Sequence, residues 1–240
     1  MSTKLKIDEP TLNALKNFAT INTSLVFREN GHLRTINEES GGFRAEFQSL
    51  VKFPYDFGVY DLPQFLKAMT LVSRGSKPTD VVLDFSEQGS HCFLKCGRNK
   101  IRYVFSPVDL LVSPKKDVKP PKGDIQLLLT NDDINNIRSM SSFINAKKVF
   151  FTPHDDTSIK IEIYDDEDRS GNRSETIVEG TSDLDHFHVG LDVDYLKMLA
   201  DDYQLSISSK KVTHWKGVKH GLVYYAVTTM KSQFGKEISS

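Results

Sequence analysis

Short runs of alternating apolar and polar residues dominate the chain. Such runs occupy residues 91–96, 101–105, 158–164, 211–215 and 222–227. The alternation is typical of strands with one buried face, and turn pairs such as Gln88-Gly89 and Asn30-Gly31 separate strands. We therefore expect a protein built mostly of antiparallel β-sheet.

Four helical segments interrupt the strands, two in each half of the chain. Each follows a side chain that can accept hydrogen bonds from the free amides of a first helical turn. The start signals are Asp8 with Pro10, Asp61 with Pro63, Thr130 or Asn131 with Asp132 and Asp133, and Asp192. The positions expected to face the core are Leu12, Leu15, Phe18 and Ala19 in the first helix and Ile134, Ile137, Met140, Ser141 and Ile144 in the third.

The helical segments repeat along the chain. Residues 12–16 (Leu-Asn-Ala-Leu-Lys) return 122 positions later as Ile-Asn-Asn-Ile-Arg. Residues 57–59 and 65–69 return 130 positions later, and a polar insertion at 165–174 accounts for the larger offset. Internal repetition of this kind predicts two copies of one structural unit.

A proline- and lysine-rich segment separates the two copies. Residues 107–123 cannot hold a helix or a central strand. We therefore expect an N-terminal domain at 1–106, an interdomain connector at 107–123 and a C-terminal domain at 124–240. Each domain should pack two helices on one side of antiparallel sheets, which places the protein in the α+β class.

Charge is distributed unevenly along a chain whose net charge is −1. Residues 1–106 carry +3, the connector +2 and residues 124–240 carry −6. Because proteins that grip phosphates tightly are usually basic overall, any contact with DNA should be local and loose. The N-terminus lacks the apolar stretch of a signal peptide, so we expect an intracellular location. Cys92 and Cys96 are too far apart along one strand to bridge easily, and we expect neither a disulfide nor a zinc site.

The outward faces of the first three helices carry cations among neutral amides and hydroxyls. Lys16 and Arg138 occupy equivalent positions in the repeat, and Lys67 and Arg74 share one face of the second helix. Past the first turn these helices contain no carboxylate, whereas an ordinary solvated face mixes both signs. The pattern favours a surface that lies along a phosphate backbone. The alternative is four solvated helices with chance charges, and in the fourth helix two aspartates indeed follow Lys197.

Several motifs resemble the DNA polymerase sliding clamp of T-even-type bacteriophages. The most specific is the run 15–22, Leu-Lys-Asn-Phe-Ala-Thr-Ile-Asn, followed by Tyr60-Asp61-Leu62 and the apolar pairs at 65–66 and 71–72. The proline-rich connector, Asp132-Asp133-Ile134 and a final strand around 224–227 follow in the same order. The resemblance implies a DNA-clamp fold in which three two-domain subunits close head-to-tail into a ring, with twelve helices lining the hole.

The same resemblance implies a function and a set of partners. It implies a non-catalytic processivity factor without cofactor or metal that encircles duplex DNA regardless of sequence and tethers the viral DNA polymerase. It further implies loading by an ATP-dependent clamp loader, a role as a mobile platform for late transcription, no membrane association, and action in the cytoplasm of the infected bacterial host.

The resemblance also suggests site residues by position. The candidates for lining the hole are Lys16, Lys67, Arg138 and Lys197, with Arg74, Lys147 and Lys148 at helix ends. The candidates for an apolar pocket that takes a partner's C-terminal peptide are Val118, at the family's pocket position, and its neighbours Leu110, Leu111 and Val112. A purely structural role is the alternative for these apolar residues.

A competing hypothesis is a metal-dependent phosphodiesterase. Asp183, His186 and His188 lie close together in the sequence, and the two histidines share one face of a predicted strand. The repeat places His188 opposite Gly58, in a run that leads into a lining helix. No phosphate-binding glycine loop or zinc spacing accompanies the cluster, so we favour solvated polar residues at a strand edge.

Overall fold

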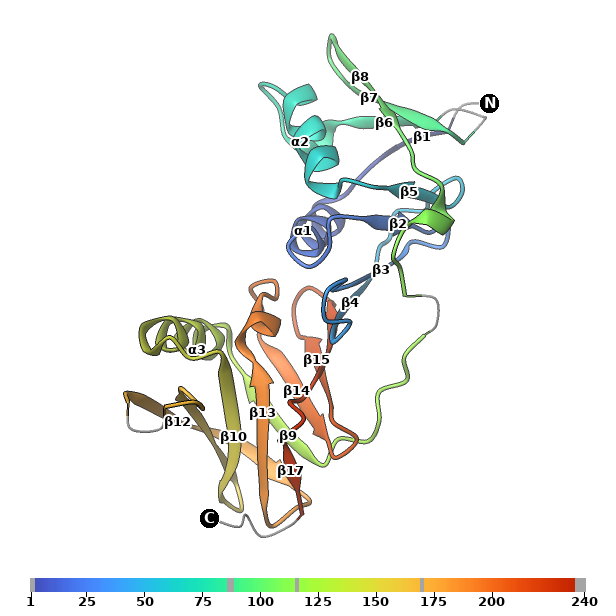
Figure 1. The fold of residues 1–240 in the computed structure, drawn as a ribbon. Coiled ribbons are helices and arrows are strands. Elements are labelled where there is room, and N and C mark those ends of the chain that lie inside the picture. Colours follow the sequence, from blue (N-terminus) through green and yellow to red (C-terminus); the bar gives the residue numbers. More distant parts are fainter. Residues whose placement is uncertain (1–2, 86–88, 115–116, 169–170, 236–240) are drawn as a thin grey trace. The chain divides into compact units, whose positions relative to one another are not determined.

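The computed structural model describes residues 3–85, 89–114, 117–168 and 171–235. The chain divides into two compact units, Met1–Asp117 (unit 1) and Val118–Ser240 (unit 2), which are drawn in Figure 1. The division falls inside the proline- and lysine-rich segment 107–123.

Unit 1 contains two antiparallel sheets and two α-helices. The strand orders are β1-β6-β7-β8 and β4-β3-β2-β5. Helix α2 packs against β7 and β8, and α1 packs against β4 and α2. The elements are β1 (Thr3–Lys6), α1 (Glu9–Phe18), β2 (Leu25–Phe27), β3 (His32–Ile36), β4 (Phe43–Gln48), β5 (Phe57–Val59), α2 (Leu62–Val72), the 3-10 turn η1 (Pro78–Asp80), β6 (Val82–Phe85), β7 (His91–Cys96), β8 (Asn99–Val104) and the 3-10 turn η2 (Val108–Leu110).

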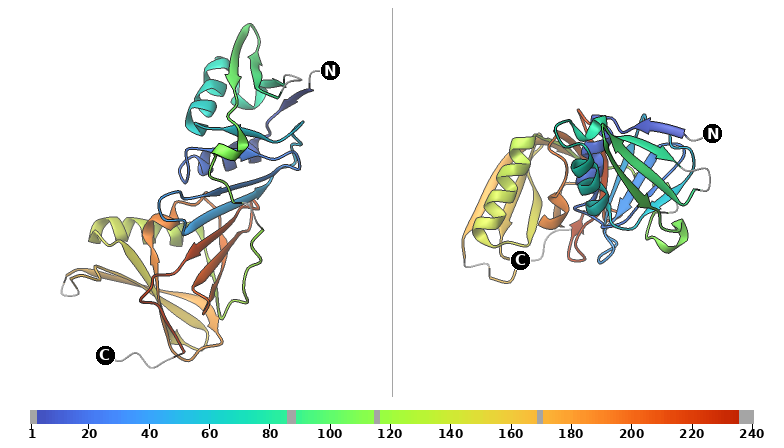
Figure 2. Two further views of the ribbon diagram at one scale, coloured as in Figure 1. Left: turned by 45° about the vertical axis from the view of Figure 1, so that its right-hand side comes forward. Right: turned by 90° about the horizontal axis from the view of Figure 1, so that it is seen from above.

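Unit 2 has one continuous sheet in the order β17-β13-β10-β11-β12-β9-β14-β15-β16. Helix α3 packs against β9, β10 and β11, and Figure 2 shows it lying across one face of this part of the sheet. The elements are β9 (Ile125–Leu129), α3 (Asn131–Ile144), β10 (Lys148–Asp155), β11 (Ser158–Tyr164), β12 (Arg173–Ser182), β13 (Phe187–Asp192), the 3-10 helix η3 (Val193–Leu196), β14 (Tyr203–Ser208), β15 (Val212–Gly217), β16 (Val223–Val227) and β17 (Gln233–Phe234).

The two units repeat the same strand pairings, which confirms the internal repeat. The pair β1–β6 corresponds to β9–β14, and β2–β5 corresponds to β10–β13. The hairpins β3–β4 and β6–β7 correspond to β11–β12 and β14–β15. Unit 2 differs because the end of its long strand β12 also pairs with β9, and this pairing joins its two half-sheets into one.

The predicted helix starts are confirmed by their capping hydrogen bonds. Asp8 Oδ1 accepts from the Thr11 amide at 2.9 Å, and Asp61 Oδ1 accepts from the Gln64 amide at 2.8 Å. Thr130 and Asp133 bond reciprocally across the first turn of α3. Side-chain capping of this kind is local, so it can be recognised without knowledge of the fold.

The prediction of a fourth α-helix is wrong about its length. Asp192 caps η3, but the helix has only four residues, Val193–Leu196. Two tyrosines engage the backbone just beyond it: the Leu199 amide donates to the hydroxyl of Tyr224 at 3.0 Å, and the Tyr203 hydroxyl donates to the Leu199 carbonyl at 2.6 Å. These bonds replace the ones that would continue the helix.

Each unit has its own hydrophobic core. In unit 1 the rings of Phe27 and Phe57 stack with centroids 4.6 Å apart. In unit 2 the buried aromatic side chains Tyr203, Trp215 and Tyr224 pack edge to face around Tyr203. In the part of the chain that the structure describes, no helix is long and apolar enough to cross a membrane.

Candidate nucleic-acid interface

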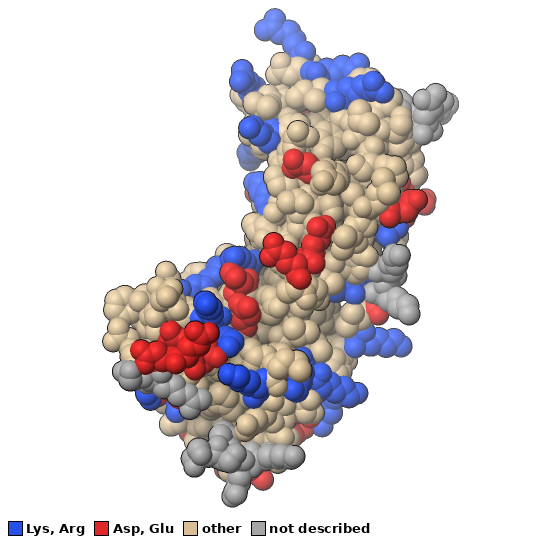
Figure 3. Space-filling model, viewed as in Figure 1, with Lys and Arg blue, Asp and Glu red and all other residues tan. Residues whose placement is uncertain are grey.

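Unit 1 presents three exposed cations on one pair of helices. Lys16 lies on α1, Lys67 lies on α2, and Arg74 follows the end of α2. Among the described residues none of the three forms an ion pair. Figure 3 shows basic side chains along the flank of unit 1 on which the two helices lie. These charges are therefore available to a polyanion.

Unit 2 holds its candidate cations differently. Lys148 Nζ lies 2.5 Å from Asp166 Oδ2, and Lys197 Nζ lies 2.6 Å from Asp194 Oδ1. Lys197 follows η3 instead of standing on an α-helix. Of the four candidates in unit 2, Lys147 is the one that is exposed and has no ion pair among the described residues. Two of the four candidate cations of unit 2, Lys148 and Lys197, are thus neutralised locally.

Arg138 is half-buried on α3, and its positive charge influences two tyrosines in the core of unit 2. Burial raises the pKa of Tyr203 and of Tyr224, and the nearby positive charge of Arg138 works against both shifts. The equivalence of Arg138 with Lys16 in the sequence repeat is therefore not an equivalence of exposure.

The polar insertion between β11 and β12 accounts for one of these neutralised cations. The side chain of Lys148 holds the pKa of Asp166 below its usual range. Figure 3 shows acidic side chains gathered on this part of unit 2. The insertion therefore places negative charge beside the start of β10, where the sequence predicted a free cation.

The last turns of α3 show apolar side chains to solvent. Met140 was expected in the buried stripe but is exposed, and the Phe143 side chain beside it is 77% exposed. The buried stripe runs through Ile134, Ile137 and Ser141. At 3.6 residues per turn, Met140 points to the side of this buried stripe, so Met140 and Phe143 form an apolar patch on the surface.

The four candidate pocket residues separate into two groups. Leu111 is buried in unit 1, and its Cδ1 lies only 2.7 Å from where a Cβ on Gly58 would stand. Leu110 and Val112, on either side, are exposed. Val118 is half-buried, and its carbonyl accepts a hydrogen bond from the Tyr225 hydroxyl at 3.4 Å. Leu111 therefore anchors the connector by packing, while Leu110 and Val112 remain accessible to a partner.

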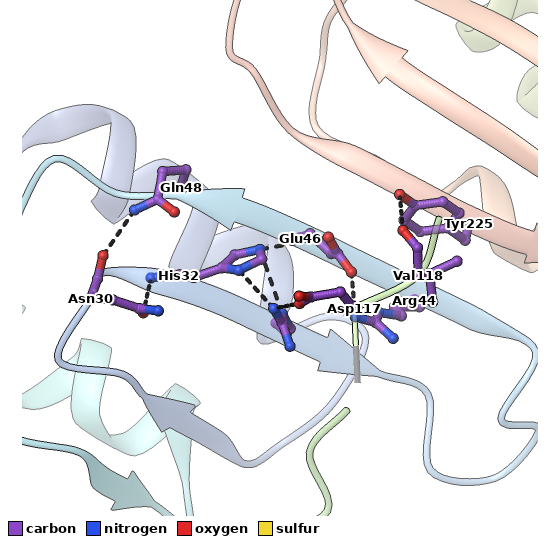
Figure 4. A network of polar contacts seen from close by, with 9 residues as sticks. Asn30, His32, Arg44, Glu46, Gln48, Asp117, Val118 and Tyr225 are labelled. Carbon is purple, nitrogen blue, oxygen red and sulfur yellow. Dashed lines mark hydrogen bonds and ion pairs between the residues drawn. The ribbon is translucent and has the colours of Figure 1, made fainter. Parts of the chain in front are cut away.

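A charged network that the sequence analysis missed covers the outward face of β3 and β4 (Figure 4). Arg34 donates to Asp117 of the connector and to His32 Nδ1, the latter at 2.8 Å. On the neighbouring strand Arg44 pairs with Glu46, whose carboxylate also lies 3.5 Å from His32 Nε2. The alternation of residues 32, 34, 44 and 46 could have indicated a shared face, but not the contribution of Asp117.

The histidine in this network should titrate abnormally. Burial and the adjacent Arg34 guanidinium lower the pKa of His32 below 6.5 despite the opposite influence of Glu46. The unfolded chain therefore binds the proton first, and the stability that neutral His32 contributes is full above about pH 6.5 and is lost as the pH falls through the folded pKa. We expect NMR titration to give a pKa below 6.5, and R34Q to raise it. An unchanged value in R34Q would contradict the pairing of Arg34 with His32.

The structure does not assemble the metal site of the competing hypothesis. Within the described residues, no group of three or more His, Cys, Asp and Glu side chains could hold a metal ion. Asp183 pairs with Lys122 at 2.8 Å, and His188 stacks on Phe150 and bonds to the Tyr164 hydroxyl. Asp183 and His188 thus contact different partners and do not come together as a pair of metal ligands.

The architecture is that of a DNA clamp. Solved structures of proliferating cellular nuclear antigen have the same architecture. The crystal structure of the Entamoeba histolytica protein matches with a TM-score of 0.69 at 8% identity, over 95% of this chain and 98% of that one. The A. fulgidus protein, bound to the C-terminal region of FEN-1, has a TM-score of 0.69 at 15% identity over 97% of this chain and 100% of that one.

In sequence the chain resembles the sliding clamps of T-even-type bacteriophages. It is 25% identical to the sliding clamp of Vibrio phage KVP40 over 235 residues, which are 93% of this chain and 99% of that protein. It is 22% identical to the sliding clamp of Escherichia phage RB69 over 151 residues, 63% of either chain. No protein-family model matches the chain.

Proposed function

We propose that the chain is a sliding clamp, a non-catalytic homotrimeric ring that encircles duplex DNA and tethers a viral replicative polymerase. The observation that carries this proposal is the duplicated clamp unit, present twice in a chain that resembles a phage sliding clamp over 93% of its length. A topological link needs no tight contact with phosphates. This agrees with a net charge of −1 and with the small number of exposed cations on the helices.

Two free strand edges of opposite charge support a ring built head-to-tail. Strand β8 ends its sheet and exposes Lys100 and Arg102. Residues 173–179 of β12 pair with β11 on one side only, among the described residues, and expose Glu175 and Glu179 with one basic residue, Arg173. A free edge is a template for another strand, and opposite charges favour β8 of one copy against β12 of the next. Such a contact is heterologous, and it closes into a ring when the rotation permits.

A helix close to each free edge adds an apolar contact. Helix α3 displays Met140 and Phe143 in unit 2, and α2, which packs on β8, displays Leu71 in unit 1. If β8 and β12 of neighbouring copies pair, these side chains would be buried at the same junction, which removes apolar surface from water.

Sedimentation equilibrium at several protein concentrations tests the assembly. Three chains of 27.2 kDa give about 82 kDa. A mass of about 82 kDa that persists on dilution supports the closed ring. A strict monomer at high concentration would overturn the ring and with it the proposed function.

The proposed partners follow from the same likeness. They are the viral DNA polymerase, an ATP-dependent clamp loader and factors for late transcription, acting in the cytoplasm of an infected bacterium. The solved clamp that carries the C-terminal region of FEN-1 supports docking of a partner's terminal peptide. The exposed connector residues Leu110 and Val112 are the apolar part of our proposed docking surface, and Val118 is a further candidate at the family's pocket position.

A further inference from the structure

Two largely buried arginines share one face of unit 1 with too few carboxylates. The Arg34 and Arg44 side chains are only 18% and 11% exposed. They lie on paired strands, where Arg34 faces Glu46 directly across the ladder. Glu46 is the single carboxylate that β3 and β4 contribute to this face, and it contacts Arg44. Because a buried guanidinium needs a compensating anion, the face requires a second negative charge.

The connector supplies that charge from outside the sheet. Asp117 contacts Arg34, yet its own side chain is 77% exposed. Asp117 lies outside the helices and strands, and among the described residues its carboxylate contacts Arg34 alone. Arg44 Nε is buried and finds no hydrogen-bond acceptor among the described residues, which leaves capacity for another oxygen.

We propose that Arg34 and Arg44 form a carboxylate seat, which Asp117 fills in the free protein and an acidic side chain of the polymerase's clamp-binding peptide fills in the complex. This inference rests on the proposed function, because it assigns the chemistry of a partner that docks beside the connector. Exchange of one carboxylate for another keeps the guanidiniums compensated throughout. An acidic peptide must displace Asp117 before its own carboxylate can bind, which lowers its apparent affinity, whereas a peptide without a carboxylate gains nothing from the seat.

The seat itself can be tested without any partner. In the full-length chain labelled with 15N-arginine, D117N should leave the seat open. Sodium acetate should then shift the Arg34 side-chain resonance, whereas sodium chloride at the same ionic strength should not. In D109N, which removes an exposed aspartate of the same connector and keeps Asp117, acetate should have little effect. Equal responses to acetate and chloride in D117N would overturn the seat.

The exchange is tested with a fluorescent peptide taken from the C-terminus of the cognate polymerase, and a copy with its Asp and Glu residues changed to amides. D117N should tighten binding of the acidic peptide about tenfold, R34Q should weaken it about tenfold, and D109N should leave it unchanged. Unchanged affinity in D117N and R34Q, or equal effects on the amide peptide, would overturn the exchange.

Failure of the proposed function looks different from failure of the exchange. If the chain is monomeric and neither peptide binds any variant, polymerase tethering fails and the exchange fails with it, while the acetate titration still decides whether the seat exists. If the chain is trimeric and the peptides bind without regard to Asp117, only the exchange is lost.

Discussion

Replacing Lys16 and Lys67 together with glutamate is expected to shorten the products of processive synthesis on a long primed template about tenfold or more. Both side chains are exposed on helices and lack ion pairs among the described residues. Each reversal changes the local charge by two elementary units, and a trimer repeats the change three times. A surface that centres DNA would then repel its phosphates. Product length is read on denaturing gels with excess competitor DNA to trap released polymerase.

The matched control reverses two exposed lysines that lie on strands. K4E with K216E makes the same change in net charge away from the helices and should leave product length nearly unchanged. K197E should have a smaller effect than the helix variant, since Lys197 already pairs with Asp194. Equal losses in the helix and strand variants would show that net charge matters and that Lys16 and Lys67 do not line the hole.

Changing Phe143 to aspartate is expected to dissociate the ring. The side chain is 77% exposed in the single chain, and in the proposed trimer it packs against the next copy. Loss of a buried aromatic anchor, with a charge in its place, costs about 2–4 kcal/mol per junction, or a roughly 30- to 1,000-fold weaker association. Sedimentation at decreasing concentrations should therefore show monomers where the parent chain remains trimeric.

Val218→Asp provides the control for this substitution. Val218 is another exposed apolar residue, located in the loop between β15 and β16 and remote in sequence from α3. We expect V218D to sediment like the parent chain. An F143D protein that also remains trimeric at the lowest concentrations would exclude the end of α3 from the junction.

The parts of the fold that could be predicted from sequence are those fixed by local chemistry. Asp8, Asp61 and Thr130 cap their helices through bonds that span only three residues. The repeat could be recognised because equivalent helices keep the same spacing of apolar and basic positions. Together these features were enough to define an α+β chain with a duplicated unit.

The parts that could not be predicted depend on contacts distant in sequence. The fourth helix stops early, and the Leu199 amide just beyond it donates to the hydroxyl of Tyr224, 25 positions away. Lys148 is neutralised by an aspartate 18 positions away, in the insertion. Asp117 reaches Arg34 across 83 positions. Helical periodicity carries no information about such partners, so exposed cations were predicted at Lys148 and Lys197, where the structure has ion pairs.

The most direct test of the central claim is whether the protein is linked to DNA topologically. The protein is loaded onto nicked circular duplex DNA with its clamp loader and ATP, and the complex is isolated by gel filtration. A single cut with a restriction enzyme then converts the circle to a linear molecule of the same sequence. We predict that the protein stays with the circle at high salt and slides off the linear DNA. Equal retention on both forms would mean ordinary binding to the duplex and would contradict the encircling ring.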